Sequence, residues 1–132
     1  TMSPTITVEV APGELIDKIT ILEIKSEQIQ DAGKLANVRI ELATLVEARD
    51  GAIPASEELE RLTAELKEIN LSLWRIEDDI RDCEREKDFG PRFIELARSV
   101  YRTNDRRAAV KRSINELLGS KLIEEKSYRQ YE

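Results

Sequence analysis

The feature that most constrains the fold of this chain is a regular apolar spacing between residues 59 and 83. Steps of three and four residues place all of these side chains on one stripe of an α-helix. A stripe sustained over so many turns is typical of long helices that pack side by side in coiled-coil fashion. We therefore predict one long helix over residues 56–88, with this stripe facing a helical partner. The stripe consists of Leu59, Leu62, Leu66, Ile69, Leu73, Ile76, Ile80 and Cys83.

The helical partner is predicted immediately downstream, over residues 91–118. The connection "DFGPRF" is short, with Gly90 suited to a left-handed backbone position and Pro91 to the first turn of the next helix. Two long helices joined by so few residues pack antiparallel. The sequence thus predicts a long αα-hairpin.

The N-terminal half predicts a strand and two shorter helices. "TITVEV" alternates β-branched and polar residues over 5–10, which favours a short strand that must pair with another segment. Helical periodicity follows over 13–31 and 34–49, and one bent helix over 13–49 is an alternative. Residues 120–132 are expected to form a short helix or a tail.

Together these elements predict one all-α domain over residues 1–132. Its architecture is an antiparallel helical bundle with a long coiled-coil-like αα-hairpin and a short N-terminal β-strand. The helix over 13–31 is apolar around most of its circumference, so it must be covered on several sides. We expect it to be central or to lie in a dimer interface, and we predict a homodimer on this ground.

The amino-acid composition excludes several classes of chemistry. The chain has 0 histidines and 1 cysteine, so neither a Ser-His-Asp nor a Cys-His nucleophile can be assembled. The same counts leave too few ligands for tetrahedral zinc. We expect no metal site and no cofactor, and any chemistry would depend on carboxylates, Lys, Arg, Tyr or amides.

Charge and hydropathy also restrict the partners. The net charge of −6 argues against nucleic acid, whose phosphates require a basic surface. No apolar run approaches the ~18–20 residues of a membrane span, so we expect no membrane partner. A single cysteine cannot form an internal disulfide and suits a reducing compartment. We expect a cytoplasmic protein.

Positive charge gathers on the segment "ARSVYRTNDRRAAVKRSIN", residues 97–115, which carries six cations and one acid, a sum of 6 − 1 = +5. The apolar pattern of this helix turns one row of its polar residues inward, including Asn115. The antiparallel hairpin brings polar residues of the preceding helix opposite this row. The predicted cluster is Asn70, Trp74, Glu77, Tyr101, Asn104, Arg107 and Lys111, with Asp17 and Lys18 as candidate contributors.

Two interpretations of this cluster remain open from the sequence. Buried amides and ion pairs can select one register of long helices, in which case the cluster is structural. Alternatively, Arg107 and Lys111 neutralise a phosphate or carboxylate, and Trp74 and Tyr101 cover an apolar or sugar face of the ligand.

Longer motifs, "PGELIDKITILEIK", "KLANVR", "LW-IEDDIR", "ARSVY-TNDRRA-VKR-IN" and "GS-L-EEKSY", resemble a bacterial domain-of-unknown-function family of small helical cytoplasmic proteins. The resemblance runs from about residue 6 to residue 131 and implies no reaction and no cofactor. Because the sequence shows no phosphate loop, no metal cluster and no nucleophile with a base, we expect a non-enzymatic interaction or scaffold protein that binds itself or another protein. The alternative is a binder of, or an enzyme acting on, a small anionic metabolite. The motifs include Asp17, Lys18, Trp74, Glu77, Tyr101, Asn104, Asp105 and Lys111.

Overall fold

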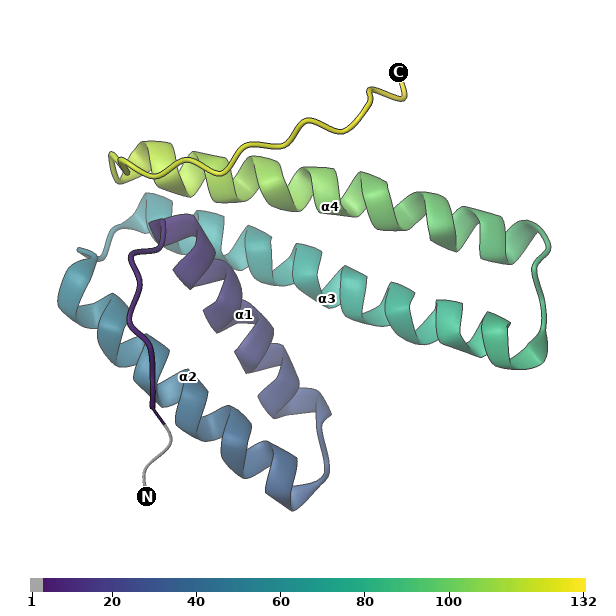
Figure 1. The fold of residues 1–132 in the computed structure, drawn as a ribbon, viewed down its shortest axis with the longest axis horizontal. Coiled ribbons are helices and arrows are strands. Elements are labelled where there is room, and N and C mark those ends of the chain that lie inside the picture. Colours follow the sequence, from purple (N-terminus) through teal and green to yellow (C-terminus); the bar gives the residue numbers. More distant parts are fainter. Residues whose placement is uncertain (1–3) are drawn as a thin grey trace.

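A computed structural model describes residues 4–132 of the chain, and all regular secondary structure in this range is α-helical (Figure 1). The predicted all-helical class is therefore confirmed. Residues 29–31 separate the first two helices, so the alternative of one bent helix is wrong. The helices are α1 (Pro12–Gln28), α2 (Ala32–Ala52), α3 (Glu57–Glu86) and α4 (Pro91–Leu117).

Local sequence explains where most helices begin and end. Pro12 occupies the first turn of α1, where its missing N–H costs nothing. The side chains of Asp31 and Ser56 cap α2 and α3 by accepting from backbone N–H groups three residues on, at 2.9 and 3.1 Å. The left-handed residue that ends α3 is Lys87, at φ 56°, and not Gly90 as predicted from the sequence. Gly90 instead has φ −82° and precedes α4.

The long helices α3 and α4 lie side by side and run in opposite directions, and we call this pair the hairpin (Figure 1). Helix α1 lies between the hairpin and α2 and contacts all three other helices. Because α1 is covered on several sides within one chain, its apolar circumference does not by itself require a second copy. The homodimer stays a prediction. The main apolar core joins α1 to the hairpin through Ile16, Leu59, Leu62, Leu66, Ile69, Val110 and Ile114.

Residues 5–10 do not form the predicted strand. They lie along the surface without strand pairing, and Ile6 and Val8 are 85% and 67% exposed. A strand needs a neighbouring backbone for its ladder, and residues 4–132 offer none to this segment. The tail, residues 120–132, was a candidate partner but forms neither strand nor helix and runs back along α4 (Figure 1).

Burial changes midway along the apolar stripe of α3. Leu66 and Ile69 are 0% and 2% exposed, but Leu73 and Ile80 are only half-buried. The change occurs at Asn70, which is the last residue of α3 to bond a side chain of α1. Helix α1 therefore buries the first half of the hairpin stripe, whereas in the second half Leu73, Ile76 and Ile80 stay half-buried and only Cys83 is 0% exposed. We call residues 73–100 the distal half of the hairpin.

Candidate functional site

Two polar residues of α1 are buried on the side that faces the hairpin. Asp17 is 1% exposed and Thr20 is 0% exposed, and the two lie one turn apart. The Thr20 hydroxyl donates to the backbone carbonyl of Asp17 at 2.7 Å, which leaves the Asp17 carboxylate to be satisfied by other helices. Burying a carboxylate without hydrogen-bond partners costs roughly several kcal/mol. Neighbouring residues must therefore supply partners for Asp17.

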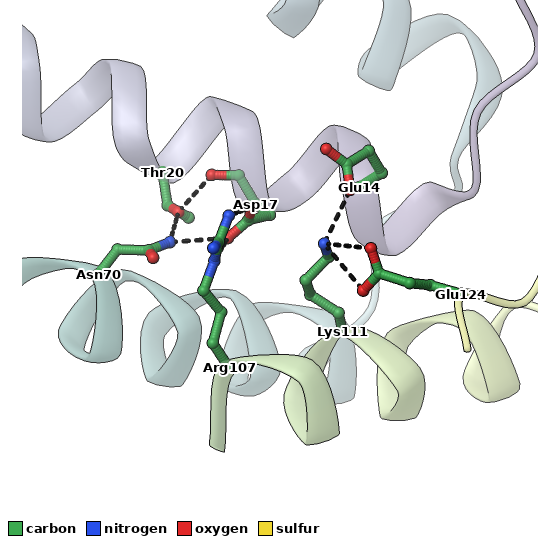
Figure 2. A network of polar contacts seen from close by, with 7 residues as sticks. All are labelled: Glu14, Asp17, Thr20, Asn70, Arg107, Lys111 and Glu124. Atoms are coloured by element: carbon green, nitrogen blue, oxygen red, sulfur yellow. Dashed lines mark hydrogen bonds and ion pairs between the residues drawn. The ribbon is translucent and has the colours of Figure 1, made fainter. Parts of the chain in front are cut away.

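Helices α3 and α4 each supply one partner (Figure 2). Arg107 of α4 donates to both carboxylate oxygens of Asp17, from Nε to Oδ1 at 2.9 Å and from Nη2 to Oδ2. Asn70 of α3 donates from Nδ2 to the same Oδ1 at 2.8 Å and to the Thr20 hydroxyl at 2.9 Å. A bidentate Arg–carboxylate pair is among the stronger hydrogen-bonded contacts. One carboxylate thus joins three helices.

The electrostatics of this pair keep the cation charged. The hydrogen bond to Asp17 raises the pKa of Arg107, against the opposing effect of burial. The nearby carboxylates of Glu14 and Glu124 raise it further. Arg107 therefore has no role as a proton donor or acceptor near neutral pH.

Lys111 lies one turn beyond Arg107 on α4 and is 7% exposed. Its Nζ donates to Glu14 of α1 at 2.7 Å and lies 3.3 Å from Oε1 of Glu124 in the tail (Figure 2). Burial lowers the pKa of Lys111, but the hydrogen bond to Glu14 and the carboxylates of Asp17, Glu14 and Glu124 outweigh it. The pKa is therefore raised, and the lysine is a structural cation rather than a base.

The start of α1 approaches α4 closely. The backbone N–H of Gly13 donates to Oδ1 of Asn115 at 2.7 Å, and Asn115 is 2% exposed. A Cβ on Gly13 would lie 2.5 Å from the carbonyl oxygen of Lys111, so only glycine fits this crossing. The close crossing brings Glu14 and Asp17 within reach of the cations of α4.

The structure brings together four of the predicted site residues, namely Asp17, Asn70, Arg107 and Lys111. It adds Gly13, Glu14, Thr20 and Glu124, which the sequence did not indicate as site residues. The available signal was Gly13, a poor helix former placed in the first turn of a helix. We call Glu14, Asp17, Thr20, Asn70, Arg107, Lys111 and Glu124 the polar cluster (Figure 2).

Three predicted residues lie outside the polar cluster. Lys18 turns toward α2, where its Nζ lies 3.2 Å from Glu41. Glu77 is exposed and pairs with Arg81 one turn along α3. Trp74 is half-buried on α3 and makes no side-chain hydrogen bond to any residue between 4 and 132.

Tyr101 and Asn104, the other predicted residues, line a groove between α4 and the tail. The volume of this groove is about 1030 Å³. Lys126 of the tail donates to Asp105 at 2.7 Å, and Lys126 and then Tyr131 lower the pKa of Asp105. The groove is lined by Val100, Tyr101, Asn104, Asp105, Arg107, Ala108, Lys111 and residues 124–131.

The polar cluster is internally satisfied. Its two cations face three carboxylates, a sum of 2 − 3 = −1. Among the described residues, every buried side-chain nitrogen and oxygen has a hydrogen-bond partner. Residues 4–132 also contain no group of three or more acidic or cysteine side chains placed to hold a metal ion. The arrangement is suited to joining helices, and its cations are not free to receive an anion.

The model of the "Family of unknown function (DUF6165)" matches residues 6–131. No curated protein and no solved structure matches the chain. Of the helices that the structure describes, none has the length and apolar character required to cross a bilayer.

Proposed function

This chain belongs to a family of unknown function, and we propose from its geometry that it is a non-enzymatic interaction protein that assembles as a homodimer. The observation that supports this proposal is the change of burial along the hairpin. The apolar spacing of α3 continues without interruption from Leu59 to Cys83, yet beyond α1 its residues Leu73, Ile76 and Ile80 are only half-buried, and Cys83 alone is buried again. A stripe that repeats this regularly is suited to a helical neighbour along its whole length.

The distal half presents apolar side chains from both helices. Leu73 and Ile80 of α3 are half-buried, as are Phe93 and Val100 of α4. In the first half of the hairpin, α1 covers the equivalent positions. A second helical surface placed over the distal half would remove this apolar area from water, which is the main favourable term in association.

The charges of the distal half favour a second copy as the neighbour. Residues 73–86 of α3 carry three cations and six acids, a sum of 3 − 6 = −3, and residues 91–100 of α4 carry two and one, a sum of 2 − 1 = +1. In a two-fold dimer the same surface is used twice, so α3 of each copy can lie against α4 of the other. Opposite charges then face each other across the interface.

Individual ion pairs support this distribution. Arg98 and Arg102 lie 3.5 and 3.7 Å from the same carboxylate, Glu95, so two cations of α4 share one acid. Within the described residues, Asp78 and Glu84 of α3 have no cation within the 4.0 Å of an ion pair. In the two-fold dimer, α4 of the second copy would place its arginines near Asp78 and Glu84 of the first.

The polar cluster then has a structural role in the proposed function. It fastens α1 across the first half of the hairpin and fixes the register of α3 against α4, which leaves the distal half available. The competing function, binding of a small anionic metabolite by Arg107 and Lys111, requires cations that the cluster already neutralises. Thermal-shift measurements with phosphate and citrate separate the two. A metabolite site predicts a stabilising shift that Arg107→Ala abolishes, and the interaction function predicts none.

Light scattering after size-exclusion chromatography tests the dimer. Ala97 lies on α4 between Phe93 and Tyr101, on the stripe of the distal half, and Ala97→Glu would place a charge in the interface. Ala109→Glu is the matched control, because Ala109 is exposed on the same helix beside the polar cluster. We expect a dimer for the natural chain and for Ala109→Glu, and a monomer for Ala97→Glu. A monomeric natural chain at tens of micromolar, or a dimeric Ala97→Glu variant, would contradict the proposal.

A further inference from the structure

The tail covers one side of α4 without being packed into the protein. It leaves the end of α4 and runs back along the helix in extended form (Figure 1). All of its residues from 121 to 132 are exposed, and its apolar residues Leu122 and Ile123 are 37% and 38% exposed. The tail therefore gains little from apolar burial, and its position depends on polar and aromatic contacts.

Besides the exposed ion pair of Glu125 with Arg112 at 3.6 Å, three contacts are spaced along α4. Glu124 lies 3.3 Å from Lys111, and Lys126 donates to Asp105 at 2.7 Å. Ion pairs between exposed side chains contribute little to stability, so most of this attachment is weak. The third contact is between the rings of Tyr131 and Tyr101, whose centroids are 4.9 Å apart.

The groove between the tail and α4 shows that the tail does not fill the surface it covers. Its volume of about 1030 Å³ is at the upper end of the range for ligand sites. Its walls include the buried Lys111 and the rings of Tyr101, Tyr128 and Tyr131. Tail residues 124–131 form one wall of this groove and residues of α4 form the other.

We propose that the face of α4 along this groove is a binding site for an extended peptide segment of a partner protein that carries an acid and an aromatic residue, and that the tail occupies this face when the partner is absent. The peptide places a carboxylate on Lys111 in place of Glu124 and an aromatic side chain on Tyr101 in place of Tyr131. The tail itself defines the spacing, because its acid and its tyrosine are separated by 131 − 124 = 7 residues. This site goes beyond the proposed dimer, which uses the distal half of the hairpin.

The charges of the site select a peptide over a free anion. Lys111 keeps its contact with Glu14 at 2.7 Å when Glu124 leaves. The two cations of the polar cluster are then still balanced by the carboxylates of Glu14 and Asp17, so they attract an isolated phosphate or carboxylate only weakly. A longer ligand adds contacts at Asp105 and at Tyr101. Ten residues of helix separate Lys111 from Tyr101, about 15 Å at ~1.5 Å per residue, a span that only an extended ligand covers.

Competition by the tail lowers the apparent affinity of the site. An external peptide binds only the fraction of molecules whose tail has left the groove, so its apparent dissociation constant is divided by that fraction. Weakening the tail contact without changing α4 must therefore increase the affinity for an external peptide. This effect distinguishes a shared binding site from a tail that merely lies on the surface.

The test titrates the full chain against a fluorescently labelled peptide of the tail sequence, "SKLIEEKSYRQYE", and follows fluorescence anisotropy. Glu124→Lys in the chain repels the tail from Lys111 and leaves α4 unchanged, so we expect at least tenfold tighter peptide binding than to the natural chain. Glu125→Lys is the matched control, because Glu125 faces the exposed Arg112 at 3.6 Å, and it should change the affinity less than threefold.

Two further variants locate the peptide. Tyr101→Ser in the Glu124→Lys chain removes the aromatic contact and should weaken peptide binding at least tenfold while the helix content by circular dichroism stays the same. A peptide that itself carries Glu124→Lys should bind neither chain. Equal binding to the natural and Glu124→Lys chains, or no binding to the Glu124→Lys chain at millimolar peptide, would overturn the proposal. Val100 belongs to both proposed surfaces, so light scattering reports the oligomeric state of every chain in the titration, and binding is compared between chains in the same state.

Discussion

Replacing Arg107 with leucine tests the role of the polar cluster most directly. In Arg107→Leu, the Asp17 carboxylate stays 1% exposed but loses the guanidinium that contacts both of its oxygens. Removing one partner of a buried ion pair costs roughly 3–5 kcal/mol, because an uncompensated charge remains. Asn70 still donates to Asp17 at 2.8 Å, so we expect the lower part of this range, about 3 kcal/mol.

The reverse replacement should cost less, and the asymmetry follows from burial. In Asp17→Asn the cation left without its partner is Arg107, whose side chain is 29% exposed and can turn toward water. The new amide can also still accept a hydrogen bond from Asn70. We expect a loss of about 1–2 kcal/mol, the cost of a weakened buried hydrogen bond.

The double variant measures the coupling between the two residues. Asp17→Asn combined with Arg107→Leu leaves no charge behind, so its loss of stability should be smaller than the sum of the two single losses by about 1–3 kcal/mol. Unfolding in urea at pH 7, followed by circular dichroism at 222 nm, gives the free energy of unfolding for each variant.

An exposed pair provides the control for this cycle. Arg81 pairs with Glu77 one turn away on α3, and their side chains are 71% and 52% exposed. We expect Arg81→Leu to change the free energy of unfolding by less than about 0.5 kcal/mol, the value of a surface pair at this spacing. If Arg107→Leu is as mild as Arg81→Leu, or if the losses in the double variant simply add, Asp17 and Arg107 do not form the buried pair described above.

Three further measurements address the helix crossing, a cap and the buried lysine. Gly13→Ala should destabilise the protein by about 1–3 kcal/mol in urea unfolding, because its Cβ meets the Lys111 carbonyl, whereas Gly51→Ala in α2 meets nothing and should stabilise by about 0.5–1 kcal/mol. Equal effects of the two would refute the close crossing. Ser56→Ala should cost about 1 kcal/mol of the same free energy through loss of the α3 cap, and a loss below about 0.3 kcal/mol would contradict it. Because the pKa of Lys111 is raised above 10.5, its charged form contributes stability that is complete below this pH and lost above it. As the pH rises beyond 10.5, the free energy of unfolding in urea should therefore fall less for Lys111→Met than for the natural chain. An equal fall in both chains would contradict this.

The fold was predictable from the sequence to the extent that it depends on periodicity. The 3-4 spacing along α3 and the short connection before Pro91 determine two long helices and their antiparallel direction. The inward position of Lys111 followed from the same periodicity. The segment 5–10 was predicted wrongly, because alternation shows what a strand would look like and not whether a second backbone lies beside it.

The polar cluster was predictable only in part. Asn70, Arg107 and Lys111 all lie on the hairpin. The short connection between α3 and α4 sets how the two helices align, so the proximity of these residues could be inferred. Glu77 and Lys18 had suitable chemistry, but neighbours on their own surface pair with them instead. A helical wheel indicates the direction in which a side chain points, but it does not indicate which oppositely charged residue lies nearest to it.

The sequence by itself determined the helices, the hairpin and the exclusion of histidine or thiol–imidazole chemistry, because these depend on local periodicity and on which residue types are present. Only the tertiary structure decided that Asp17 receives Arg107 and that Glu124 reaches Lys111. These contacts depend on how α1 and the tail cross α4, and a crossing is set by the packing of the whole chain, such as the missing Cβ of Gly13. Local pattern carries no information on that geometry.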